Sequence, residues 1–434
     1  MACELIKNSD ELFMNFDTIS VVGLGYIGLP TAAVIASRKK RVIGIDINQH
    51  AVDTINKGEI HIVEPELDIL VHAVVTEGFL RATTIPEPAD AFLIAVPTPF
   101  KGDHEPDLSY IESAVTLIAP VLERGNLVIL ESTSPVGATE KMAAWLAKAR
   151  PDLTFPQSCG EGSDIRVAHC PERVLPGHVI RELVENDRVI GGLTLKCSEA
   201  AVNLYKIFVD AECVITNART AEMAKLTENS FRDVNIAFAN ELSVICDKLN
   251  INVWELIKLA NRHPRVDILQ PGAGVGGHCI AVDPWFIVST TPEEAKLIHK
   301  ARLVNEGKPD WVVAKIESAV LDHLRNNPGK VLTDIKIACM GLAFKPDIDD
   351  LRESPALDIA KTISQKFHNQ VYVVEPNIEH TPAELGKVEL LDTESAIKVA
   401  DIIVVLVKHG GFEGLEDRIQ NGKTLLDVVG LTSK

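Results

Sequence analysis

One motif near the N-terminus constrains the fold of this chain more than any other feature. Residues 18–22 form a short run rich in β-branched side chains, and Gly23, Gly25 and Gly28 follow at the spacing G-x-G-x-x-G. An alanine-rich helical stretch comes next, and then a second apolar strand that ends in Asp46. A strand, a glycine-rich turn, a helix and a second strand predict the first βαβ unit of a doubly wound α/β fold.

The same residues predict a dinucleotide site. Glycines at these positions make the tight turn, let the backbone approach a pyrophosphate and let the helix pack on the strand. The free N–H groups and the dipole of the helix N-terminus favour the anion. Asp46 stands 18 residues after Gly28, and its carboxylate suits a ribose 2′-hydroxyl but repels a 2′-phosphate, which favours NAD over NADP. The alternative is a glycine-rich turn in another α/β fold.

Polar residues follow two further apolar runs. Residues 91–96 and 127–130 are almost continuously apolar, as buried parallel strands are. Thr98 and Thr133 come just after them. Because polar residues beyond the carboxyl ends of such strands line the ligand crevice, both are candidate cofactor or substrate contacts. The alternative is that each threonine only caps the turn that follows its strand.

Length and charge exclude several classes of protein. A chain of 434 residues predicts two or three domains. The net charge of −18, without a basic run, argues against binding to nucleic acid or to an anionic membrane. The first residues lack an apolar signal core, and the longest apolar runs are too short to span a bilayer. The eight scattered cysteines indicate neither a metal site nor a disulfide framework. We expect a cytoplasmic enzyme or binding protein.

A second glycine-rich segment, residues 270–284, carries a candidate nucleophile. Four of its residues are glycines, and Cys279 and Asp283 follow them. The glycines allow positive φ and close approach of a ligand to the main chain. A thiol presented from such a loop is a candidate nucleophile, and the alternative is a turn with a buried, inert cysteine.

A long helix is predicted from about residue 221 to residue 249, with Thr220 as its N-cap. Four polar residues share one face by helical spacing, namely Lys225, Asn229, Arg232 and Asn240. Such a stripe is commonly a solvated face, but the apolar character of the helix favours burial, and a buried lysine needs a partner or a function. A helix of this length could also join two domains and form a dimer interface.

The chain divides into four predicted segments. Residues 1–17 are an extension, residues 18–215 the dinucleotide domain, residues 216–328 a central helical domain, and residues 329–434 a second α/β domain. The last domain has parallel-strand patterns but no G-x-G-x-x-G, so we assign it a nucleotide site served by Lys345 and not a second NAD.

Eight motifs, in chain order, resemble the UDP-glucose/GDP-mannose dehydrogenase family, and the match extends from about residue 18 to near the C-terminus. They are GLGYIGLP at 23–30, VPTP at 96–99, STSPVG at 132–137, PER at 171–173, AEMAKLxxN at 221–229, NE at 240–241, GxGxGGxCxxxD at 272–283 and GxxFKP at 341–346. Residues 231–241 and 261–265 most resemble the members that oxidise UDP-N-acetyl-D-mannosamine (UDP-ManNAc) for bacterial surface polysaccharides such as enterobacterial common antigen.

The resemblance implies two Rossmann-like domains joined by a long central helix, in a cytoplasmic homodimer. It implies oxidation of a UDP-sugar at C6 with two NAD used in turn, through a thiohemiacetal and a thioester on Cys279. Catalytic roles carry over to Cys279, Lys225, Asn229, Asp283, Glu172 and Thr133. Cofactor contacts carry over to Gly23, Gly25, Tyr26, Ile27, Gly28, Asp46, Thr98, Thr133 and Arg352. Substrate contacts carry over to Arg173, Val174, Lys225, Asn229, Arg232, His263, Arg265, Gly276, Phe344 and Lys345.

Two departures from the family pattern bear on the substrate. His278 precedes the cysteine where many UDP-glucose enzymes have serine, and residues 280–282 also differ, which argues for an N-acetylated sugar over UDP-glucose. Val429 stands where the family usually has a basic residue, so one substrate contact is expected to be missing or replaced. Other readings are a UDP-GlcNAc or UDP-glucose 6-dehydrogenase, a single-step hydroxyacid dehydrogenase that needs no nucleophilic cysteine, and a silent NAD-binding protein.

Overall fold

The computed structural model describes residues 15–62, 64–102, 104–175, 177–277, 279–368, 370–419 and 422–432. Residues 1–14 of the expected extension lie outside these ranges. The chain forms two compact units, residues 1–227 and 228–434, and the finer division of the second unit at residue 328 remains a prediction. Within the described ranges, no helix combines the length and the apolar character needed to cross a membrane.

The first unit is built on an eight-stranded sheet with the order β10-β9-β8-β7-β4-β1-β2-β3. Its strands are β1 (Thr18–Val22), β2 (Arg41–Ile45), β3 (Leu80–Thr83), β4 (Ala91–Ile94), β7 (Leu127–Leu130), β8 (Arg166–His169), β9 (Arg188–Gly192) and β10 (Cys213–Asn217). The pairs are parallel except β8 with β9, which is antiparallel. A small antiparallel ribbon joins β5 (Phe100–Lys101) to β6 (Glu105–Pro106).

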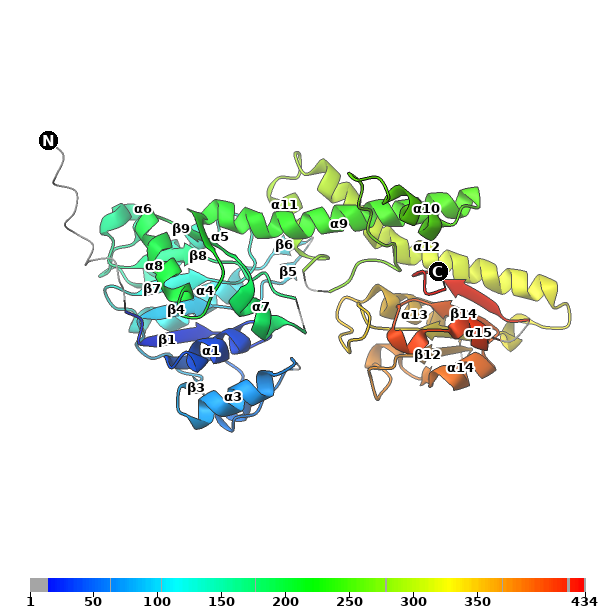
Figure 1. The fold of residues 1–434 in the computed structure, drawn as a ribbon, viewed down its shortest axis with the longest axis horizontal. Helices are drawn as coiled ribbons and strands as arrows, with labels where there is room; N and C mark the ends of the chain where they lie inside the picture. The colour runs from blue at the N-terminus through cyan, green and yellow to red at the C-terminus, as the bar shows by residue number, and fades with distance from the viewer. Residues whose placement is uncertain are drawn as a thin grey trace. The chain divides into compact units, whose positions relative to one another are not determined.

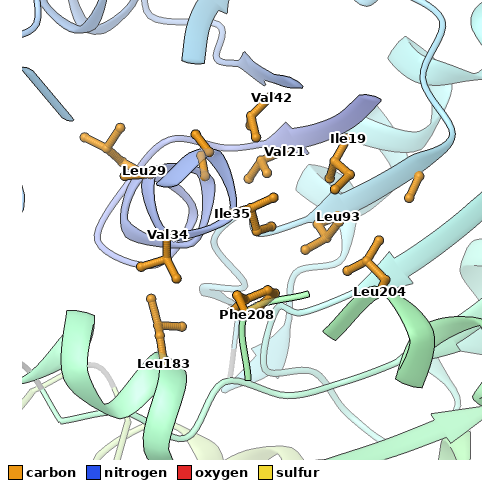
Figure 2. Close-up of a cluster of buried hydrophobic side chains, with 14 of the residues drawn as sticks. Ile19, Val21, Leu29, Val34, Ile35, Val42, Leu93, Leu183, Leu204 and Phe208 are labelled. Atoms are coloured by element: carbon orange, nitrogen blue, oxygen red, sulfur yellow. The ribbon is translucent and has the colours of Figure 1, made fainter. Parts of the chain in front are cut away.

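Helices cover both faces of this sheet (Figure 1). One face packs against α1 (Gly28–Ser37), α2 (Gln49–Asn56), α3 (Leu67–Thr76), α7 (Val179–Glu185) and α8 (Leu195–Tyr205). The other packs against α4 (Ser109–Ile118) and α5 (Ala138–Ala149), with the short α6 (Pro156–Cys159) beside α5. Figure 2 shows Ile35 of α1 beside Val21 of β1 and Leu93 of β4, in an apolar cluster that also includes Leu29. The predicted doubly wound architecture is confirmed.

The long α9 (Ala218–Leu249) belongs to both units, and three further helices follow it, α10 (Val253–Ala260), α11 (Asp283–Thr290) and α12 (Lys296–Asn326). The prediction of Thr220 as the N-cap was wrong. The helix begins at Ala218, and the Asn217 side chain accepts a hydrogen bond from the Thr220 N–H at 2.9 Å. Asparagine is a strong N-cap because its side-chain oxygen reaches the N–H groups of the first turn.

The second unit contains a five-stranded parallel sheet with the order β13-β12-β11-β14-β15. Its strands are β11 (Ile337–Met340), β12 (Val371–Val374), β13 (Glu389–Leu390), β14 (Ile402–Val405) and β15 (Thr424–Asp427). Helices α12 and α13 (Pro355–Lys366) pack on one face, and α14 (Thr393–Val399) and α15 (Leu415–Arg418) on the other. Short 3₁₀ turns lie at Ala119–Val121, Gly160–Gly162, Leu332–Asp334, Ala383–Leu385 and Gly410–Phe412. Each sheet therefore presents a row of carboxyl strand ends.

Candidate functional site

The first glycine turn separates two roles among its glycines. Gly23 has φ +91°, and a Cβ there would lie 2.5 Å from the Ala95 carbonyl oxygen. A Cβ at Gly28 would collide with the Gly23 carbonyl. No described atom lies within 4 Å of a Cβ built at Gly25. The outer glycines thus permit the turn and the packing, while the middle one faces open space that a pyrophosphate could enter.

The residues around this turn fit NAD. In the described structure no side chain caps the N-terminus of α1, and its first turn carries no acidic residue, so its N–H groups suit a phosphate. Asp46 accepts hydrogen bonds from the Leu24 N–H at 2.8 Å and the Asn48 N–H at 2.9 Å. Its carboxylate is therefore anchored on the glycine turn. Tyr26 is exposed and Ile27 is half-buried between the second and third glycines.

The two strand-end threonines lie together. The Thr98 hydroxyl, beyond β4, donates to the Thr133 carbonyl oxygen, beyond β7, at 2.5 Å. Both side chains are half-buried. This bond ties the two strand-end loops to each other, and the cofactor and catalytic roles of these threonines remain predictions.

Glu172 is buried in an ion pair that the sequence did not indicate. Its Oε2 accepts from Arg188 at 2.8 Å, and both side chains are almost fully buried. Its Oε1 accepts from the Arg173 N–H at 2.6 Å. The buried partner of the Glu172 carboxylate is thus the side chain of Arg188, and not that of the adjacent Arg173. The Arg173 guanidinium donates to the Asp187 carbonyl. Val174 packs against the apolar cluster between α1 and the eight-stranded sheet.

A second buried carboxyl group lies next to this pair. Glu131 follows β7 and accepts a hydrogen bond from the Tyr205 hydroxyl at 2.6 Å. Burial raises the pKa of Glu131 to about 7, although the Tyr205 hydrogen bond opposes the shift. The Arg188 guanidinium lies 5.5 Å from the centre of the Tyr205 ring. The only sequence signal for Glu131 was its place directly after an apolar strand.

Glu222 fixes the start of α9 in the first unit. Its carboxylate accepts from the Gly137 N–H at 2.6 Å, and from the Thr139 N–H and hydroxyl at 2.8 and 2.6 Å. These N–H groups belong to the first turn of α5, so Glu222 caps that helix from a distance in sequence. Lys225 comes three residues later and is half-buried, not fully buried as the apolar pattern suggested.

The cysteine loop presents its thiol. Cys279 is exposed, so the alternative of a buried, inert cysteine was wrong. Its carbonyl oxygen accepts from the Asp283 N–H at 2.8 Å, one turn before α11. Asp283 is buried, and its Oδ2 accepts from the Asn229 amide at 2.5 Å. The structure thus brings together Asp283 and Asn229, two predicted catalytic residues, one turn from the thiol.

Three glycines of the cysteine loop pack closely against other residues of the protein. A Cβ at Gly274 would lie 2.7 Å from Pro355, and one at Gly276 would lie 2.9 Å from the Cβ of Phe344. Gly277 has φ +82°, and its Cβ would lie 2.8 Å from the Phe344 ring. Close packing on Pro355 and Phe344 therefore requires glycine at these positions, and the approach of a ligand to the main chain here stays a prediction. Gly276 and Phe344, both predicted substrate contacts, are neighbours.

The remaining predicted contacts occupy three places in the second unit. Arg232 is exposed on α9, and His263 and Arg265 lie in the turn after α10, where the His263 ring accepts from the Arg265 N–H at 3.3 Å. Lys345 is half-buried after β11. Arg352 makes a two-point ion pair with Asp350 at 2.6 and 2.8 Å. Their roles remain predictions.

A cationic group lies near Val429. The Lys408 ammonium, which follows β14, donates to the carbonyl oxygen of Gly430 at 2.9 Å. The Val429 N–H itself donates to Asp427 at 3.1 Å. A lysine from another strand end therefore reaches the turn where the basic side chain is lacking.

Three family models match this chain, with descriptions that fit the two units. The NAD binding domain of the UDP-glucose/GDP-mannose dehydrogenase family matches residues 17–209, the central domain residues 219–307, and the UDP binding domain residues 338–434. The chain belongs to the UDP-glucose/GDP-mannose dehydrogenase family. The predicted family and NAD cofactor are confirmed, and the chain is an NAD-dependent dehydrogenase with a UDP binding domain.

Individual members of this family resemble the whole chain. The UDP-N-acetyl-D-mannosamine dehydrogenase of Yersinia pestis is 65% identical over 96% of this chain and 100% of its own length. An NDP-N-acetyl-D-galactosaminuronic acid dehydrogenase of Ralstonia nicotianae is 64% identical over 97% of both chains. The solved UDP-D-ManNAc dehydrogenase of Pyrococcus horikoshii superposes with a TM-score of 0.84, at 40% identity, over 95% of this chain and 96% of its own.

Proposed function

We propose that this enzyme oxidises UDP-ManNAc at C6 to UDP-N-acetyl-D-mannosaminuronate. The alcohol, two NAD⁺ and one water give the carboxylate, two NADH and three protons. The substrate rests on relatives of that name, which include the Yersinia pestis enzyme at 65% identity and a Staphylococcus aureus structure at 41% identity and a TM-score of 0.82. Use of the product in a surface polysaccharide such as enterobacterial common antigen stays an expectation from the resemblance.

One observation carries the mechanism, namely an exposed thiol one turn before a buried Asp283–Asn229 pair. The first oxidation converts the C6 hydroxyl to an aldehyde, and bound NAD supplies the hydride acceptor in both oxidations. The Cys279 thiolate then forms a C–S bond to C6, which holds the aldehyde as a thiohemiacetal. Loss of a second hydride gives a thioester, and water breaks the C–S bond and releases the carboxylate and the thiolate.

The neighbouring side chains stabilise charge in these steps. Lys225 and the second amide N–H of Asn229 are assigned to the oxyanions that form at C6. Asp283 accepts the other Asn229 N–H and so sets the direction of the amide. Glu172 is assigned as the base for thioester hydrolysis, with Arg188 holding its carboxylate. The Gly23–Gly28 turn and Asp46 are assigned to the cofactor, with Thr98 and Thr133 beside it.

We infer a homodimer formed through α9. Phe231, Phe238 and Ile245 recur every seven residues and are 69%, 50% and 44% exposed in the single chain. Apolar residues at this period form one stripe along a helix, and a second copy of the helix would cover it. We place the enzyme in the cytoplasm because NAD and nucleotide sugars are available there.

A second substrate deserves a direct test. The Ralstonia relative named for N-acetyl-D-galactosaminuronic acid is 64% identical, within one percentage point of the Yersinia enzyme. The alternative is therefore a C6 dehydrogenase for another N-acetylated nucleotide sugar, and UDP-GlcNAc and UDP-glucose remain further alternatives.

The test measures NADH formed per sugar consumed, with UDP-ManNAc, UDP-GalNAc, UDP-GlcNAc and UDP-glucose offered separately. We expect two NADH with UDP-ManNAc. Two NADH with another sugar alone would keep the mechanism and reject the substrate, and one NADH would favour a single-step dehydrogenase.

The Cys279→Ala variant tests the covalent step. We expect it to make no net acid while its affinity for NAD is unchanged, because Cys279 lies outside the Gly23–Gly28 turn that is assigned to the cofactor. Cys159→Ala, which removes another exposed thiol, is the matched control and should retain full activity. Undiminished acid production by Cys279→Ala would reject the mechanism.

A further inference from the structure

A chain of buried hydrogen bonds connects α9 to α12 beside the cysteine loop. The Asn240 amide donates to the Asn305 side-chain oxygen at 2.9 Å. The Asn305 amide donates to the Asp233 carboxylate at 2.8 Å and to its backbone carbonyl at 3.1 Å. Arg302 donates to the same carboxylate at 2.6 Å. All four residues are at most 2% exposed, so water does not compete for these bonds.

This chain of bonds ends on the loop. The Asn240 Oδ1 accepts from the Gly272 N–H at 2.9 Å, at the first residue of the glycine-rich run. Asn229, on the same helix, donates to Asp283 at the other end of the loop. The two asparagines stand eleven residues apart, which is about three helical turns, or roughly 16 Å along one face of α9. One rigid helix therefore holds the loop at both ends, with Cys279 between the two bonds.

The network determines which atom of Asn240 faces the loop. An amide side chain carries an acceptor oxygen and a donor nitrogen that could exchange places. Asn305 uses its own N–H groups on Asp233, so its oxygen is left to accept from Asn240. The Asn240 nitrogen must therefore face Asn305, and its oxygen must face the Gly272 N–H.

The same network is poorly built for stability alone. Burial raises the pKa of Asp233, although the Arg302 charge opposes the shift. The Asp233 Oδ2 and the Arg302 Nε have no hydrogen-bond partner among the described residues. Buried ion pairs with unsatisfied atoms contribute little net stability compared with apolar residues of the same size. Orientation of a group at the end of the network is a better account of why the protein buries these polar side chains.

We propose that Asn240 is a positioning residue for catalysis, which holds the Cys279 loop so that the thiol captures the aldehyde before it escapes. The proposal rests on the proposed function, since it needs a covalent second oxidation. The first oxidation does not need the thiol. Loss of the Asn240–Gly272 bond should therefore impair the second hydride transfer more than the first.

The experiment compares Asn240→Ala with the wild-type enzyme by NADH formed per sugar consumed, with hydroxylamine present to trap free aldehyde. We expect the ratio to fall from two toward one, trapped aldehyde to accumulate, and kcat for acid formation to fall at least tenfold, with the Kd for NAD unchanged. Asn235→Ala is the matched control, because Asn235 is a half-buried asparagine of α9 whose amide donates to the Phe231 carbonyl of its own helix and takes no part in the bonds described above. It should keep a ratio of two.

Two further variants distinguish a role of Asn240 in positioning the loop from a role in the stability of the fold. Asn240→Asp keeps an oxygen for the Gly272 N–H and, in its protonated form, an O–H for the Asn305 oxygen, so it should give a ratio closer to two than Asn240→Ala does. If Asn240→Ala does not fold, Asn305→Ala removes the partner that orients Asn240 and carries the same prediction with a smaller loss.

A folded variant of lower thermal stability that still gives two NADH and no trapped aldehyde would overturn the positioning role. Cys279→Ala, assayed in parallel, tests the proposed function itself. If that variant also gives two NADH, the covalent mechanism fails, and the Asn240 result is read as structural.

Discussion

Two glycine turns, one in each unit, use the same backbone device. Gly23 follows β1 with φ +91°, and Gly341 follows β11 with φ +92°. In each case an acidic residue at the end of the next strand accepts from the N–H just after the glycine. Asp46 accepts from Leu24 at 2.8 Å, and Glu375 accepts from Leu342 at 2.7 Å.

The two acids differ in what else they bind. Asp46 is half-buried, and among the described residues its other oxygen accepts one local bond, from the Asn48 N–H. Glu375 is 3% exposed and also accepts from the Ala343 N–H, from the His409 ring at 3.0 Å and from Asn377. The Asp46 carboxylate is accessible to a ribose, whereas the Glu375 carboxylate is occupied by hydrogen bonds within the protein. Access to the acid, and not its presence alone, thus separates a dinucleotide turn from a structural one.

The largest effect is expected when the structural acid is removed. Glu375→Ala leaves the Leu342 and Ala343 N–H groups and the His409 ring without their partner in a buried place. We expect a loss of about 4 kcal/mol in the free energy of unfolding, measured by urea denaturation. The exposed Glu379→Ala is the control and should change stability by less than about 0.5 kcal/mol. A loss near zero for Glu375→Ala would erase the contrast between the two turns.

The pH dependence of stability should have opposite signs in the two units. Burial raises the pKa of Glu131, in the first unit, to about 7, so the folded state binds its proton more tightly than the unfolded state does. Stability should fall as pH rises from about 4.5 to 7, by on the order of 3 kcal/mol. Glu131→Gln should remove this slope in urea denaturation measured at several pH values, and an unchanged slope would refute the assignment.

Glu375 should act in the other direction. Burial alone would raise the pKa of this carboxyl group, but the bonds from His409, Leu342 and Ala343 outweigh it and lower the pKa. A lowered folded-state pKa gives stability that is present above about pH 4.5 and is lost as pH falls further. Glu375→Gln should flatten the acid limb of the stability curve and leave the region between pH 5 and 7 unchanged.

A smaller effect is expected at the ligand-facing acid. Asp46→Ala removes the carboxylate assigned to the ribose, and we expect roughly a tenfold weaker affinity for NAD, or about 1.4 kcal/mol. The free energy of unfolding should fall by only about 1 kcal/mol, since the Leu24 N–H loses one partly exposed bond. Calorimetric titration with NAD measures the first quantity, and an unaltered affinity would contradict the assigned role of Asp46.

The smallest effect is expected at Lys408, on the strand ends of the second unit. Lys408→Ala removes the cation that reaches Gly430 beside Val429, and we expect a roughly threefold rise in KM for the nucleotide sugar, as for one exposed charge. The affinity for NAD should not change, because this lysine belongs to the unit without the dinucleotide turn. An equally large loss of affinity for NAD would contradict the proposal that the nucleotide sugar and NAD bind at separate strand ends.

The sequence predicted those parts of the fold and site that depend on local pattern. The first glycine turn, the parallel strands and the long helix each leave a signal within a few dozen residues, and the structure confirms them as elements of the fold. Apart from the N-cap of α9, which is Asn217 and not Thr220, the failures involved partners far apart in sequence. Arg188 binds Glu172 across 16 residues, and Tyr205 binds Glu131 across 74, and neither pair has a spacing that marks it.

The sequence by itself determined the βαβ units, the first glycine turn and the candidate nucleophile, because backbone sterics and apolar periodicity act between near neighbours in the chain. Only the tertiary structure decided that Cys279 is exposed, that Glu375 is locked inside the protein, and that Asn240 reaches Gly272. Burial and hydrogen-bond partners depend on which distant segments pack together, and that is a property of the folded chain as a whole.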